Sequence, residues 1–130
     1  MQPQFLLIDD NRDGRELIAR AVQRKYRDAP LRDFPEFAAA VPVLAEVGAD
    51  PGDWIVLAGR TAEHGTTALV AAIRAAHPHV PIIALGRQDE ARASLEAWAT
   101  HFLAYEAWLL LGVMVERVIS AWPATPRPGS

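Results

Sequence analysis

The sequence predicts an α/β protein in which a parallel sheet is covered by helices on both faces. Five short apolar runs alternate with five stretches whose apolar residues recur at helical spacing. The runs are apolar on both faces, and such strands are typical of parallel sheets buried between two layers of helices. With 130 residues, 51% of them apolar, the chain is expected to form one domain with a proper core.

The predicted strands are the short apolar runs. The first is closed by the acidic pair Asp9-Asp10, and the second is weaker than the others. The third and fourth read as fully buried strands, and the last is short and ends at Tyr105. In order, the predicted strands are residues 5–8, 29–33, 54–57, 80–85 and 102–105.

The predicted helices are marked by their start and stop signals. The first is expected to begin at Asp13, because Glu16 three residues later completes a capping-box pattern. Pro35 opens the second helix, in which Pro42 is an irregularity, and Pro78 follows the end of the third. In order, the predicted helices are residues 13–26, 35–47, 68–76, 87–98 and 107–122.

Composition sets the domain limits and excludes several classes of function. Residues 1–122 form the predicted domain, and residues 123–130, with three prolines and a glycine, are a tail or the stub of a linker. The absence of cysteine excludes disulfides and thiolate chemistry and fits a cytoplasmic protein. A net charge of −3 argues against direct nucleic-acid binding, and no apolar run is long enough to span a membrane. No serine or histidine has the context of a catalytic group, so no enzyme activity is expected.

The carboxyl ends of the strands hold the candidate site, because ligands of such sheets bind there. Asp9 and Asp10 end the first strand and could hold a hard cation such as Mg²⁺. A further carboxylate would be needed to complete the shell, but the third strand ends in Ala58-Gly59. The other interpretation is that Asp9, Asp10 and Asp13 only stabilise the positive end of the first helix.

The order of these segments resembles that of a response-regulator receiver domain, over about residues 4 to 121. The resemblance implies a doubly wound (βα)5 flavodoxin-like three-layer sandwich, with a five-stranded sheet of order 2-1-3-4-5. The segments that carry it are Phe-Leu-Leu-Ile-Asp-Asp-Asn at 5–11, Arg-Glu-Leu-Ile at 15–18, Trp-Ile-Val-Leu at 54–57, Ala-Ala-Ile-Arg-Ala-Ala-His-Pro at 71–78 and Val-Pro-Ile-Ile-Ala-Leu at 80–85.

The resemblance also implies which positions carry the family's chemistry. Receivers bind Mg²⁺ through the acidic pair and take a phosphoryl group on an aspartate that ends the third strand, where this chain has Ala58. The switch hydroxyl after strand four is replaced by Gly86, and the lysine after strand five by Tyr105. Because Lys25 is the only lysine, no shift of the alignment restores that charge. The chain is therefore interpreted as a degenerate pseudo-receiver that needs no cofactor and binds Mg²⁺ weakly, if at all.

Two further hypotheses concern charge and contact surfaces. Arg60 could form an ion pair with the acidic pair in place of Mg²⁺. The last helix is apolar around most of its circumference, which predicts a second buried face. In receivers, helix four, strand five and helix five form a common contact surface, so the candidate interface residues are Trp98, Trp108, Leu109 and Val113. The alternative is that these side chains pack within the domain.

The function expected from the sequence is a phosphorylation-independent signalling module of a two-component pathway. It would act through a protein partner or a homodimer formed by the last two helices, with no contact to nucleic acid or membrane. Two alternatives stay open: phosphorylation at an unorthodox residue, or sensing of a small ligand or cation by the acidic cleft.

Overall fold

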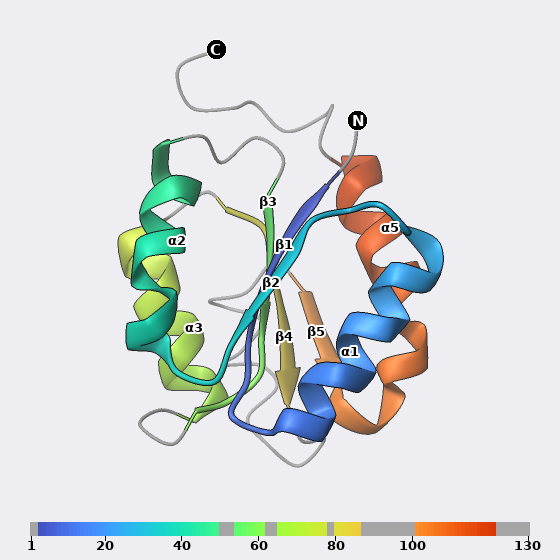
Figure 1. The fold of residues 1–130 in the computed structure, drawn as a ribbon, viewed down its shortest axis with the longest axis horizontal. Helices are drawn as coiled ribbons and strands as arrows, with labels where there is room; N and C mark the ends of the chain where they lie inside the picture. The colour runs from blue at the N-terminus through green and yellow to red at the C-terminus, as the bar shows by residue number, and fades with distance from the viewer. Residues whose placement is uncertain (1–2, 50–53, 62–64, 78–79, 87–100, 122–130) are drawn as a thin grey trace.

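A parallel five-stranded sheet of order β2-β1-β3-β4-β5 forms the centre of the molecule (Figure 1). This computed structural model describes residues 3–49, 54–61, 65–77, 80–86 and 101–121. The architecture confirms the predicted doubly wound fold, including the strand order. The strands are β1 (Gln4–Ile8), β2 (Leu31–Phe34), β3 (Trp54–Ala58), β4 (Ile82–Gly86) and β5 (His101–Ala104).

Helices cover both faces of the sheet, with α2 and α3 on one side and α1 and α5 on the other (Figure 1). A 3-10 segment, η2, joins β5 to α5. The bounds are α1 (Arg12–Lys25), α2 (Phe37–Ala49), α3 (Thr66–Ala76), η2 (Tyr105–Leu110) and α5 (Leu111–Ala121). Within the described residues, none of these helices has the length and apolar character needed to cross a membrane.

Alternation along the strands divides the core into two clusters. On β1, Leu6 and Ile8 face the cluster under α2 and α3, whereas Phe5 and Leu7 face the cluster under α1 and α5. All four side chains are fully buried, because successive side chains of a strand point to opposite faces and both faces here carry helices. The apolar runs of the sequence are thus explained by burial on two sides.

Several element boundaries differ from the predicted ones, most clearly at the first and last helices. The first helix begins at Arg12, because the Asn11 side chain accepts a hydrogen bond from the Gly14 backbone at 2.9 Å and so takes the capping role predicted for Asp13. The last helix is interrupted near Ala107, which has non-helical dihedral angles (φ −95°, ψ 25°), and regular α-helix starts only at Leu111. Pro42 lies inside α2. The predicted fourth helix and the predicted tail lie outside the described residues.

Candidate functional site

The acidic pair lies at the carboxyl edge of the sheet, where the loops after β1 and β3 meet. Ile8 pairs with Ala58 in the parallel register, so the residues that follow, Asp9 and Gly59, come side by side. The Gly59 backbone donates a hydrogen bond to the Ile8 carbonyl at 2.9 Å, and the Asp10 backbone donates to the Arg60 carbonyl at 2.8 Å. These bonds hold the two loops together and fix Asp9 against the end of β3.

Asp9 is buried, with only 1% of the residue exposed. Its Oδ1 accepts a hydrogen bond from the Asn11 backbone at 2.9 Å, whereas Oδ2 has no hydrogen-bond partner in the part of the chain that the structure describes. Burial raises the pKa of the Asp9 carboxyl above its usual value, and the charge of Asp10 adds to this. The Asn11 N–H and the cations Arg15 and Arg60 lower the same pKa, but by less. The site therefore disfavours the ionised form of Asp9.

The Asp9 carboxylate occupies the place where a side chain on residue 59 would begin. A Cβ on Gly59 would lie 2.7 Å from Asp9 Cγ and 3.0 Å from Asp9 Cβ, and it would overlap Oδ2. Real Cβ atoms do not approach other atoms so closely, and glycine is the residue that permits such contact. The end of β3 is thus filled by the side chain of its neighbour strand.

The cation that joins this edge is Arg15 of α1, which the sequence analysis did not single out. Its Nη1 donates to the Asp9 carbonyl at 2.8 Å, and its Nε lies 3.3 Å from Asp33 Oδ2 at the end of β2. Only 16% of the Arg15 side chain is exposed, so its guanidinium is held between the Asp9 carbonyl and the Asp33 carboxylate. Arg60, the predicted partner, is exposed and forms no ion pair with Asp9 or Asp10 in the described structure. The only sign of this role in the sequence was an arginine in the first turn of the helix that follows the first strand.

The other positions implied by the receiver resemblance lie at the ends of β3, β4 and β5. Ala58 is completely buried between Ile8 and Ala84, and its methyl group belongs to the core under α2 and α3. Gly86 ends β4, and Tyr105 follows β5 as the first residue of η2. A hydroxyl does reach this edge, since the buried Thr66 donates to the Leu85 carbonyl at 3.4 Å. That hydroxyl comes from the start of α3.

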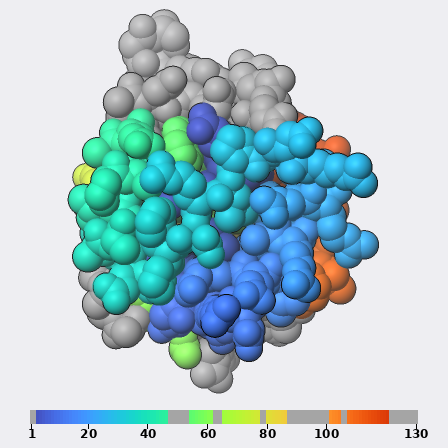
Figure 2. Space-filling model, in the orientation of Figure 1, coloured from blue at the N-terminus to red at the C-terminus, as the bar shows by residue number. Residues whose placement is uncertain are grey.

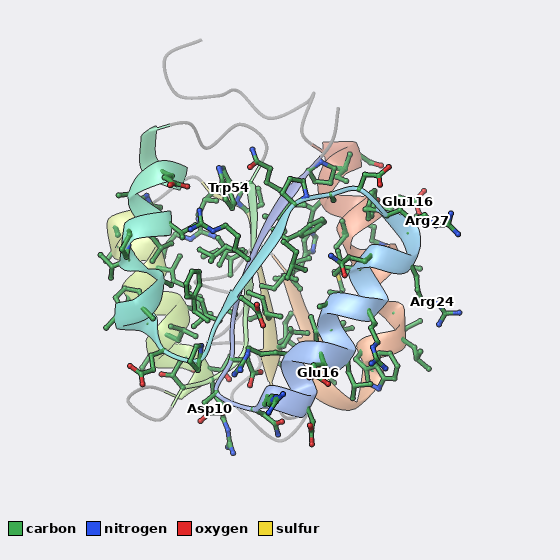
Figure 3. All side chains as sticks on the ribbon, viewed as in Figure 1. Asp10, Glu16, Arg24, Arg27, Trp54 and Glu116 are labelled. Atoms are coloured by element: carbon green, nitrogen blue, oxygen red, sulfur yellow. The ribbon has the colours of Figure 1, made fainter. Side chains whose placement is uncertain are left out.

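The described residues at this edge do not by themselves form a complete Mg²⁺ site. Asp10 is exposed and points away from the body at the carboxyl edge (Figure 3), whereas Asp9 is enclosed. Among the described residues, no group of three or more acidic, histidine or cysteine side chains is placed to hold a metal ion. The orphaned Oδ2 of Asp9 is a possible single ligand, but Ala58 and Gly59 supply no further carboxylate.

The predicted interface residues lie away from the acidic pair. Trp108, Leu109 and Val113 line a groove between α1 and the η2–α5 segment. Trp108 is half-buried, and Leu109 is 66% exposed. Trp98 lies outside the described residues, as does the helix predicted to complete this surface.

Solved structures with this arrangement of strands and helices are known. No protein-family model matches the sequence, and no curated protein matches it. The signal receiver domain of an HD domain-containing protein from Pseudomonas fluorescens superposes with a TM-score of 0.75 and 16% identity, over 95% of this chain and 90% of that chain. The signal receiver domain of a DNA-binding response regulator from Colwellia psychrerythraea gives 0.75 and 14%, over 92% and 99%.

A response regulator receiver domain from Rhodospirillum rubrum is similar over 88% of this chain and 94% of that chain, with a TM-score of 0.65 and 16% identity. At these low identities, the superpositions establish the fold but not the chemistry of the site. The strand order and these superpositions agree: the chain has the fold of response-regulator receiver domains.

Proposed function

We propose that the chain is a phosphorylation-independent, receiver-like signalling module of a two-component (phosphorelay) pathway. It acts without catalysis of its own, through contacts of its last two helices, as the sequence predicts them, with a protein partner or a second copy. The three solved structures compared above are receiver domains, which supports a role in signalling. The arrangement at the carboxyl edge argues that the signal is not a phosphoryl group.

One observation carries this proposal: the packing of Asp9 against Gly59. A phosphoacceptor needs a carboxylate that is accessible to the donor, yet the end of β3 offers a buried methyl group at Ala58 and a glycine with no room for a side chain. The remaining carboxylate of the pair, Asp10, lacks a neighbouring lysine, because Lys25 instead pairs with Glu116 of α5. Phosphoryl transfer depends on positioning and on cations that neutralise the developing charge, and no group of three metal-binding side chains lies among the described residues.

A second candidate function is a cation or small-ligand sensor, and a specific observation favours it. The Asp9 Oδ2 is buried without a hydrogen-bond partner among the described residues, which leaves one oxygen able to accept from a ligand. Arg15 and Arg60 lie close enough to lower the pKa of Asp9, and their positive charge opposes binding of a cation beside it. Titration of the parent and of Asp10→Asn with Mg²⁺, followed by tryptophan fluorescence, tests this candidate. A change in the parent that is lost in the variant would support the sensor.

The decisive experiment is incubation of the intact chain with acetyl phosphate and Mg²⁺, followed by intact-mass measurement. We expect no phosphoryl adduct, while a receiver with a complete acidic site, treated in parallel, gains one. A stoichiometric, acid-labile adduct on this chain would overturn the proposal and would indicate phosphorylation at an unorthodox residue. Peptide mapping of that adduct would then name the residue.

A further inference from the structure

A groove separates α1 from the η2–α5 segment on the outer side of the molecule. Two adjoining hollows of about 640 Å³ and 330 Å³ form it, and both are lined by Ala21, Arg24 and Trp108. Because both hollows are lined by these three residues, we call them together the α1–α5 groove. In Figure 2, α1 forms part of the front surface, with α5 along its edge.

Apolar side chains are exposed along this groove. Leu17 of α1 is 39% exposed, and on the opposite wall Leu109 and Val113 are 66% and 49% exposed. Trp108 lies between them and is only half-buried. Exposed large apolar residues scattered singly need no explanation, but three that line one groove beside a half-buried tryptophan are typical of a site that another molecule covers.

The same groove carries positive charge. Arg20, Arg24 and Arg27 line its α1 side, and none of the three forms an ion pair with a residue that the structure describes. Arg24 and Arg27 project outward, away from the sheet (Figure 3). Lys25, in contrast, is paired with Glu116. Three arginines without an ion-pair partner among the described residues therefore lie on one face of a chain whose net charge is −3.

We propose that the α1–α5 groove binds an acidic segment of a partner protein. Carboxylates of that segment pair with Arg20, Arg24 and Arg27, and an apolar side chain packs against Trp108 and Leu109. Arginine suits this role because its planar guanidinium binds a carboxylate through two parallel hydrogen bonds. Arg20 and Arg24 are one helical turn apart, about 6 Å, so the segment should carry acidic residues at a similar spacing. The proposal rests on the proposed function in assigning signalling to protein contacts.

Charge selects this occupant over two others. The chain's own C-terminal residues 123–130 contain no acidic residue and carry Arg127, so they do not complement the groove. A nucleic acid would meet three arginines here but a net negative protein around them, and tight binding to phosphates needs a broader basic surface. An acidic segment with an apolar anchor satisfies both the charge and the exposed apolar side chains.

The test is a selection of short random peptides, displayed on phage, against the intact chain. We expect the selected peptides to be enriched in Asp and Glu around a large apolar residue. One such peptide, synthesised with a fluorescent label, is then titrated with the parent and its variants. Binding should weaken about tenfold for Arg20→Glu/Arg24→Glu and by a similar factor for Leu109→Ser, as for central interface residues. Arg12→Glu, an exposed arginine of the same helix outside the groove, should bind as the parent does.

Several results would overturn the proposal. These are a selection without acidic enrichment, a peptide that binds the double charge reversal as well as the parent, or a chain dimer that Leu109→Ser dissolves while no peptide binds. The last result would assign the groove to a second copy. Circular dichroism of each variant verifies that it is folded. A phosphoryl adduct in the mass experiment, with peptide binding intact, would overturn the proposed function and leave the groove in place.

Discussion

Two glycines show how differently the carboxyl edge and the α1–α5 groove are built. At the carboxyl edge, a Cβ on Gly59 would overlap the Asp9 carboxylate. In the groove, a Cβ on Gly112 would meet nothing closer than Lys25 Cδ at 3.5 Å, an ordinary van der Waals contact. The Asp9 side chain thus fills the space beside Gly59 at the carboxyl edge, whereas Gly112 at the side of the molecule has space for a methyl group.

The arginines of α1 repeat the same contrast. Arg15 lies at the carboxyl edge, where it donates a hydrogen bond to the Asp9 carbonyl and forms an ion pair with Asp33. Arg20 and Arg24, further along the same helix, line the groove and form no ion pair with a described residue. A cation with its partners in place stabilises the fold, and one without them is available to a ligand. We therefore expect the functional surface to be the α1–α5 groove at the side of the sheet, and not the carboxyl edge.

The largest expected effect comes from Gly59→Ala. The added methyl group must displace the Asp9 carboxylate or the end of β3, and overpacking of this kind costs about 1–3 kcal/mol. We expect the free energy of unfolding, measured by urea denaturation, to fall by that amount.

The control for Gly59→Ala is a double-mutant cycle with Asp9→Ala. Removal of the carboxylate makes room for the methyl group, so the cost of Gly59→Ala should shrink in the Asp9→Ala background. Equal costs in both backgrounds would show that Asp9 is not what closes this edge, and the contrast between the two regions would lose its basis.

A second effect, of intermediate size, is a dependence of stability on pH that is specific to Asp9. Its pKa is raised in the folded protein by burial, while in the unfolded chain it is about 3.9. Between these two values the folded state binds more protons than the unfolded state, so stability falls as pH rises through the raised pKa. Below the unfolded value the contribution is fully present, and above the folded value it is lost.

The measurement compares the parent with Asp9→Asn by urea denaturation at a series of pH values upward from about 4. We expect the parent to lose more stability than the variant over the window, because the asparagine does not titrate and retains an oxygen for the Asn11 N–H. Identical slopes would mean that Asp9 titrates alike in both states, which burial at 1% exposure argues against.

The sequence was sufficient for the architecture because each strand carries its own signal. The run from Phe5 to Ile8 is apolar at every position, and the structure sends alternate side chains into two separate cores. The strand order followed from the receiver resemblance. Boundaries were harder, since Asn11 and Asp13 are both good capping residues, and the choice between them depends on how the chain leaves β1.

The details of the two regions needed the three-dimensional structure. Asp9 and Gly59 are far apart in sequence, and only the register of β1 against β3 brings them into contact. Likewise, the apolar pattern around Trp108 and Leu109 predicts a second contact face, but a single helix does not reveal that its neighbour is α1 with a row of arginines. Contacts between distant segments decide both sites.

The smallest expected effect, and the counterpart of Gly59→Ala, is Gly112→Ala. An alanine fits at this position of α5 without a clash. It also lowers the conformational entropy of the unfolded chain, which typically stabilises a protein by about 0.4–1 kcal/mol. Urea denaturation should therefore show a higher free energy of unfolding for Gly112→Ala, although the same change at position 59 lowers it. A loss of stability at position 112 would show that Lys25 packs more tightly across α5 than an open groove allows, and it would remove the room that the acidic segment needs.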